Sequence, residues 1–404
     1  MLDQPQNHAS ISLPLGFRFD EINPDRRGSA PEFTPPLGVL SHFSGKFVGT
    51  GFNLIFRPNS GPPTTTTFPK PVTPPPPTPP SENVLELNLT TEALSFSPPL
   101  GNVPNRGLEK QNDIRLNGVP YVQQISDVTN PETGKADAHE VAIHFEPGLW
   151  MHVPATTTTP VLGASLARMA SIPHGTTINA QTLEPTQTIA GPPVIPPVNI
   201  TPFVIGSNPP NLIPFASQKA ANQDTPRIPQ DLTKFMAAGT ITQEMLDDPN
   251  TVLRDAIAGK TIKETIVFTV STAPQSPEFG GGTDNIAFLL GNPAGTAANA
   301  NAVQMTATFW IETVEHTITI PIFKAGDLPL RIEAQPAKAG LPTPVFHVEP
   351  PRDITAPITI TVTSTQIQYS QVVFLNFAGL TWPHVSVATL VPAEPVPVPP
   401  FAWT

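Results

Sequence analysis

The stretch that decides the fold is the last apolar segment, Leu380-Thr381-Trp382-Pro383-His384-Val385-Ser386-Val387-Ala388-Thr389-Leu390-Val391. Its side chains alternate between two faces, which is typical of a β-strand. One face carries His384, Ser386, Ala388 and Leu390; the other carries Val385, Val387, Thr389 and Val391. We predict a final strand that is entered through a Pro383 kink. A histidine above two small side chains leaves room for a flat ligand, although a solvated histidine on a barrel-closing strand explains the same pattern.

Composition favours β-structure around one sizeable core. Proline supplies 55 of the 404 residues, which argues against a helical protein because proline removes a backbone donor and breaks helices. Charged residues make up only 13% of the chain, so we expect a surface rich in Thr, Asn, Gln and Ser. The net charge is −11 and there is no basic stripe, which argues against a nucleic-acid partner.

Several absences in the sequence narrow the functional classes. The chain has no cysteine, which excludes disulfides, thiolate zinc sites and iron–sulfur clusters. No apolar run approaches the length of a membrane span. The first residues lack the basic region and apolar core of a signal peptide, so we expect a cytoplasmic protein. The sequence leaves a homo-oligomer open.

Alternating apolar segments recur along the chain. A glycine-rich strand is predicted at 45–56, and residues 84–180 predict successive strands with interruptions at Pro147-Gly148 and Pro173-His174-Gly175, where barrels bend. Five further strands are predicted, at 261–272, 284–290, 302–324, 357–370 and 371–391. Because no βαβ rhythm is present, we predict an all-β fold: a roughly ten-stranded antiparallel barrel.

We predict a single barrel domain over residues 37–392. An extended N-terminal arm (1–36) precedes it, and a Pro-rich C-terminal tail (393–404) follows it. A Pro-rich loop (58–81) and a coil and helical insert (181–260) interrupt it. Short helices are expected within the insert, which has too few apolar residues for a core of its own.

The residues that could carry chemistry are scattered, because the sequence contains no P-loop, dinucleotide-binding, nucleophile-elbow or zinc-protease motif. His144 and His152 fall in one predicted hairpin region, and His174 lies at a strand interruption. Each could be a zinc ligand, but none shows paired ligand spacing. As alternatives, His174 caps a bulge and His152 makes a hydrogen bond at a strand end. Arg168 is a scarce charge, either solvated or an anchor for a carboxylate or propionate.

Four segments, in chain order, resemble the nitrobindin family of haem-binding ten-stranded barrels, which are related to fatty-acid-binding proteins and lipocalins. Residues 40–51 are similar to its Leu-x-Gly-x-Trp-x-Gly-x-Gly opening, with Phe47 in place of the tryptophan. Residues 144–150 are similar to its His-x-Glu-x-Gly-aromatic strand. Residues 171–178 are similar to its Pro-x-Gly turn, and residues 380–387 to the segment with the proximal histidine. The N-terminal arm, the Pro-rich loop and the insert have no counterpart in that family.

The resemblance implies a calycin-like barrel that holds haem b, with His384 as the iron ligand. The sixth iron position would be open to a diatomic ligand, a peroxide or peroxynitrite. Members of the family bind nitric oxide and isomerise peroxynitrite to nitrate, so an enzyme would be a peroxynitrite isomerase or a weak peroxidase. On this hypothesis His144 and His152 are candidate distal residues and Arg168 a candidate propionate anchor.

Two alternatives use the same barrel without a metal. One is a calycin-like carrier of a lipid or other apolar small molecule. The other is a cyclase or isomerase that shapes an apolar substrate without a cofactor. A Soret band that is lost in His384→Ala would favour haem, whereas displacement of a fluorescent fatty acid without a response to haemin would favour the carrier.

Overall fold

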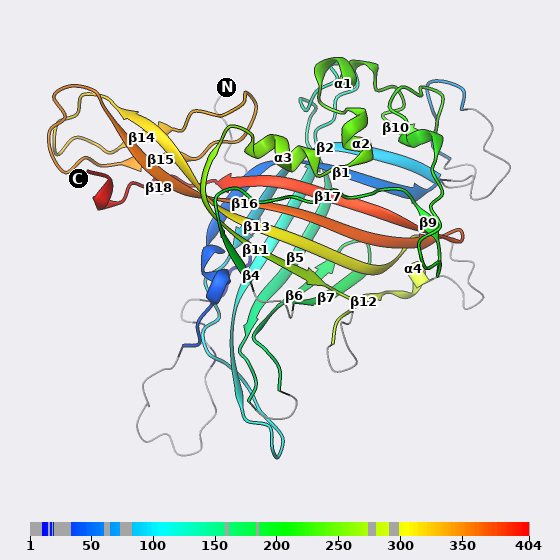
Figure 1. Cartoon of the computed structure of the whole chain (residues 1–404), viewed down its shortest axis with the longest axis horizontal. Coiled ribbons are helices and arrows are strands. Elements are labelled where there is room, and N and C mark those ends of the chain that lie inside the picture. The colour runs from blue at the N-terminus through cyan, green and yellow to red at the C-terminus, as the bar shows by residue number, and fades with distance from the viewer. Residues whose placement is uncertain are drawn as a thin grey trace.

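The structure is a computed structural model that describes residues 10–14, 17, 19, 34–59, 65–72, 83–157, 161–182, 186–273, 280–290 and 299–403. It confirms the all-β class and the closed antiparallel barrel of ten strands (Figure 1). Each of the ten barrel strands pairs with the barrel strand that follows it in the sequence, and the last pairs with the first. In order they are β1 (Gly45–Pro58), β2 (Asn83–Phe96), β4 (Ile114–Asp127), β5 (Val141–Val153), β6 (Ser165–Ile172), β7 (Thr176–Thr182), β11 (Thr261–Ser271), β13 (Asn301–Ile320), β16 (Ile358–Phe377) and β17 (Leu380–Pro392).

The barrel closes where β1 meets β17, with a register from Phe47 opposite Pro392 to Leu54 opposite Val385. A Cβ atom added at Gly51 would lie 2.2 Å from the Val387 carbonyl oxygen, and one at Gly49 would lie 2.0 Å from that of Thr389. The two glycines therefore allow the tight coiling that brings the first and last strands together.

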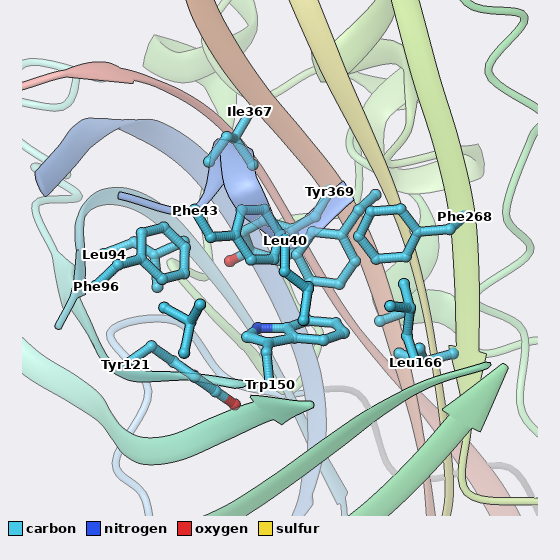
Figure 2. Close-up of a cluster of buried hydrophobic side chains, with 14 of the residues drawn as sticks. Leu40, Phe43, Leu94, Phe96, Tyr121, Trp150, Leu166, Phe268, Ile367 and Tyr369 are labelled. Atoms are coloured by element: carbon cyan, nitrogen blue, oxygen red, sulfur yellow. The ribbon is translucent and has the colours of Figure 1, made fainter. Parts of the chain in front are cut away.

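An apolar cluster fills the barrel interior at one end (Figure 2). The 3₁₀ helix η1 (Gly38–His42) closes this end, and Leu40 and Phe43 pack into the cluster. The ring of Phe43 stacks on Phe96 with centroids 4.6 Å apart, and Trp150 meets Phe309 edge to face at 5.2 Å. Aromatic pairs of this kind add to the burial energy of the core.

The insert lies against the outside of the barrel (Figure 1). Its elements are β8 (Gln187–Ala190), β9 (Phe203–Val204), η2 (Ala216–Gln218), β10 (Arg227–Ile228), α1 (Thr233–Ala238), α2 (Gln243–Asp247) and α3 (Thr251–Ile257). Phe235 and Leu253 are fully buried in a cluster with Leu54 of β1 and Val387 of β17. The apolar side chains of the insert therefore share a core with the outer face of the barrel.

A second lobe projects beyond the barrel, at the left of Figure 1. There β13 and β16 continue past the barrel, and β14 (Leu330–Glu333), β15 (Val345–Val348) and β18 (Val396–Pro397) form a small sheet beside them. The Pro-rich C-terminal tail contributes β18 to this sheet and contains η3 (Pro400–Trp403).

Some predicted boundaries differ from the structure. The strands expected at 357–370 and 371–391 are β16 and β17, and they join at Ala378-Gly379, where both residues have positive φ angles. The strand expected at 284–290 is β12 (Gly282–Asn285) followed by α4 (Ala287–Leu290). A short β3 (Val103–Asn105) also pairs with β4. Most of the N-terminal arm and of the Pro-rich loop lies outside the described residues. Among the helices described, none has the length and apolar character to cross a bilayer.

Candidate functional site

A cavity of about 700 Å³ occupies the barrel interior at the end opposite to η1. Side chains alternate along each strand between the inside and the outside of the barrel. The residues that line the cavity lie on the same inward face as those of the aromatic cluster. On β17, for example, Ala388 and Leu390 lie in the cluster, whereas Ser386 and His384 line the cavity. Most of the wall is apolar, and comprises Ile55, Ile125, Ile172, Ile178, Leu289, Ala300, Ala302, Val373, Leu375, Phe377 and Ala378.

Three histidines from separate parts of the chain line this cavity: His144 of β5, His174 of the turn between β6 and β7, and His384 of β17. His384 is held by a neighbour on β1, because its Nε2 atom lies 2.8 Å from Nδ2 of Asn53. The same amide nitrogen donates to Oγ of Ser386 at 2.7 Å. An amide nitrogen only donates, so Nε2 of His384 is the acceptor and the neutral ring carries its proton on Nδ1.

The environment of His384 keeps its ring neutral. Burial, followed by the positive charges of His144 and His174, lowers the pKa of His384 to about 3. An imidazole that is largely withdrawn from water and has no carboxylate partner disfavours its charged form, because the charge is poorly solvated. His384 is therefore a neutral hydrogen-bonding side chain in the cavity wall at physiological pH.

A layer of hydrogen-bonded polar side chains separates the cavity from the aromatic cluster. At its centre is Arg168 of β6, whose Nε donates to the Tyr121 hydroxyl at 2.8 Å and whose Nη1 donates to Oε1 of Gln371 at 2.7 Å. Its Nη2 donates to Oε1 of Glu146 at 2.7 Å. The guanidinium also lies 5.7 Å from the ring of Trp150, a cation–π distance.

Arg168 and Glu146 form a buried ion pair. Burial alone would raise the pKa of Glu146, but the charge of Arg168 and the hydrogen bond from His144 outweigh it and lower that pKa to about 2. The pKa of Arg168 is raised, because Glu146 outweighs the cost of burial. The pair therefore stays ionised over the whole range of ordinary pH.

The polar layer continues from Arg168 to a second carboxyl group. Nη2 of Arg168 also donates to Oε1 of Gln123 at 3.3 Å. Nε2 of Gln123 in turn donates to Oε1 of Glu92 at 2.8 Å and to the Tyr369 hydroxyl at 3.1 Å. That hydroxyl lies 2.6 Å from Oε2 of Glu92. Burial raises the pKa of Glu92 to about 7, although hydrogen bonds from Tyr369 and Gln123 oppose the rise.

The mouth of the cavity is formed by strand ends and loops. Arg57 of β1 lines it and is paired with Glu86 of β2. Leu289 of α4 faces into the cavity, while Phe288 on the same helix is 56% exposed. No residue of the insert is among the described residues that line the cavity, because the insert covers the outside of the barrel.

The structure brings together only part of the residue set expected from the sequence. His384 and His144 line the cavity, and Arg168 lies in the polar layer next to it. His152 lies at the opposite end of β5, where its ring is beside Gly38 of η1. Within the ranges that the structure describes, no three His, Asp or Glu side chains gather into a metal site.

Sequence reasoning missed Glu92, Gln123, Tyr369 and Asn53. A signal was present for two of them. Glu92 occupies the face of β2 that also carries Leu94 and Phe96, and Gln123 lies between Tyr121 and Ile125 on the inner face of β4. A polar side chain on the apolar face of an alternating strand points to a buried polar network or a site.

Comparisons of the chain with protein-family models, with curated proteins and with solved structures find no match.

Proposed function

We propose that the protein binds a small, largely apolar molecule inside the barrel without a metal, as a calycin-like carrier does. The observation that carries this proposal is the cavity. Its volume of about 700 Å³ lies within the roughly 300–1,000 Å³ that is usual for small-molecule sites. Aliphatic side chains make up much of its wall, and polar groups line it at the mouth, at the three histidines and next to the polar layer.

On this proposal, two parts of the site contact different parts of the ligand. The aliphatic wall supports an apolar body by burial, at roughly 25 cal/mol for each Å² removed from water. The polar floor, formed by Gln123, Tyr369 and Gln371, supports one polar end and fixes its direction. The floor is rigid, since Arg168 ties Gln123 and Gln371 to the buried Glu146.

The test is binding of N-phenyl-1-naphthylamine, an apolar probe whose fluorescence rises in dry surroundings. We expect saturable binding to the wild type and loss of binding in Val373→Trp, because Val373 lines the cavity and the larger ring would occupy part of it. The matched control is Val194→Trp, because Val194 is 88% exposed on the insert. Circular dichroism checks that both variants keep the fold. No binding by the wild type, or equal binding by the two variants, would contradict the proposal.

Haem is a second candidate because three histidines line one cavity. His384 would hold the iron, and the bound group would supply a centre for a diatomic or peroxide ligand. As placed, however, Nε2 of His384 accepts a hydrogen bond from Asn53, and an iron bond at that atom would replace it. Arg168 is a weak candidate for a propionate anchor, because Tyr121, Gln371, Gln123 and Glu146 take up four of its five N–H donors.

Haemin titration separates the two candidates. A Soret band that saturates at one haem per chain, and that disappears in His384→Ala but not in His152→Ala, would support haem. A broad spectrum that is equal in the wild type and in His384→Ala, together with saturable binding of the naphthylamine, would support the metal-free site.

A further inference from the structure

We propose that Tyr369 is the hydrogen-bond donor for a carbonyl oxygen of the bound molecule, and that Glu92 controls this donor by taking up or releasing one proton. The inference rests on the proposed function, since it presupposes a small molecule in the cavity, and it names the ligand class: an apolar ketone, ester or amide.

The first step is the direction of the hydrogen bonds in the polar layer. A guanidinium only donates, so Oε1 of Gln123, which faces Nη2 of Arg168, must be the acceptor. The amide orientation of Gln123 follows from this, and its Nε2 atom faces Glu92 and Tyr369. Both hydrogens of Nε2 are then used, one on Oε1 of Glu92 and one on the Tyr369 hydroxyl oxygen.

The second step concerns the 2.6 Å contact between Oε2 of Glu92 and the Tyr369 hydroxyl. When Glu92 is ionised it is an acceptor only, so the Tyr369 hydroxyl must donate its single hydrogen to Oε2. When Glu92 is protonated, its proton lies on Oε2, because Oε1 already accepts from Gln123. The carboxyl group then donates to the hydroxyl oxygen, and the hydrogen of Tyr369 is free for another partner.

The third step places that partner in the cavity. Tyr369 and Gln123 both line it, and on β16 Tyr369 is followed by the lining residues Gln371 and Val373. The hydroxyl oxygen accepts from Gln123 and from protonated Glu92, which fills its two lone pairs. A ligand atom at this point must therefore be an acceptor, and of the neutral acceptors that an apolar molecule can carry we propose a carbonyl oxygen, which is a strong one.

The balance between burial and the neighbouring groups places the pKa of Glu92 in the neutral range. Burial raises its pKa to about 7. The groups that face it are Tyr369 of β16, Gln123 of β4, His144 of β5 and Arg168 of β6, and all four lower that pKa. Burial and the neighbouring carboxylates raise the pKa of Tyr369 well above its usual range, so the phenol stays neutral throughout.

The experiment compares two fluorescent probes at about pH 5.5 and about pH 8.5, on either side of the Glu92 pKa. The ketone 6-propionyl-2-(dimethylamino)naphthalene carries the acceptor, and N-phenyl-1-naphthylamine lacks an acceptor oxygen. We expect the ketone to bind the wild type about tenfold more tightly at the lower pH. This ratio corresponds to the net free energy of about one hydrogen bond. The emission of the bound ketone should also lie further to the red at the lower pH than at the higher pH. The affinity for the naphthylamine should be equal at the two values.

Two variants assign the effect. Glu92→Gln copies the protonated acid, because the new amide accepts from Gln123 and donates to Tyr369; it should bind the ketone tightly at both pH values. Tyr369→Phe should bind it weakly at both. The matched control is Glu312→Gln, which changes another buried carboxyl whose pKa is raised to about 7 by burial. Glu312 does not line the cavity, so this variant should keep the pH response of the wild type.

The outcomes separate the two proposals. If the naphthylamine does not bind, the proposed function fails. If the naphthylamine binds but the affinity for the ketone is the same at both pH values, the inference about Tyr369 fails on its own. A pH response that persists in Glu92→Gln would overturn the role of Glu92 and assign the proton to another group.

Discussion

Replacing Glu92 by glutamine should change how the stability of the barrel depends on pH. Burial raises the pKa of Glu92 from 4.5 to about 7, so between these values the folded chain binds a proton that the unfolded chain releases. The free energy of unfolding therefore falls as the pH rises through this window, and the loss is complete above about pH 7. At roughly 1.4 kcal/mol for each pH unit, the loss amounts to about 3 kcal/mol.

Glu92→Gln removes this loss, since an amide does not titrate and keeps the hydrogen bonds to Gln123 and Tyr369. The free energies of unfolding of wild type and variant are measured by urea unfolding across the pH range, with the slope m checked for constancy. We expect the difference between variant and wild type to move by about 3 kcal/mol in favour of the variant from pH 4 to pH 8.5. Two parallel curves would refute the reasoning, because they would mean that Glu92 titrates alike in the folded and unfolded chain.

Three further predictions concern the same interior. Arg168→Met leaves Glu146 buried without its partner and should cost about 3–5 kcal/mol in urea unfolding; a loss below 1 kcal/mol would contradict the buried pair. Phe43→Ala opens a cavity in the aromatic cluster and should cost about 3–5 kcal/mol, whereas Phe401→Ala, at a 72% exposed residue, should cost little by the same assay. The pKa of His384 is lowered to about 3, so the unfolded chain binds a proton there first as the pH falls below 6.5, and stability falls with it. His384→Gln should flatten this acid-side loss in the same titration, and an unchanged slope would show that His384 is not buried as a neutral ring.

The barrel was predictable from the sequence because strand alternation is a local pattern. The inner face of β17 could be read from His384, Ser386, Ala388 and Leu390 alone, and the structure places those side chains inward. The small sheet of the projecting lobe was missed, because β14 and β15 have four residues each and show no usable period. Their strand conformation depends on packing against the long ends of β13 and β16.

The site was less predictable, because it depends on register between distant strands. His144 and His152 share one face of β5, so the alternating pattern alone predicts the same environment for both. Eight residues of strand nevertheless separate them by about 26 Å, which places one beside the cavity and the other beside η1. The pairing of Glu92 with Tyr369 spans 277 positions of sequence, and no local pattern indicates it.

The order of layers along the barrel axis explains why so many polar groups are tolerated inside it. An ion pair such as Glu146 with Arg168 is costly to bury and stabilises little compared with apolar residues of the same size. Stability alone would favour extending the aromatic cluster through this layer. The layer instead borders the cavity and sets the direction of each hydrogen bond from Arg168 to Tyr369. A network whose polarity is fixed by a group that can only donate presents a defined donor or acceptor to a ligand, which an apolar floor cannot do. This is why we assign ligand recognition to the polar layer and not to the histidines alone.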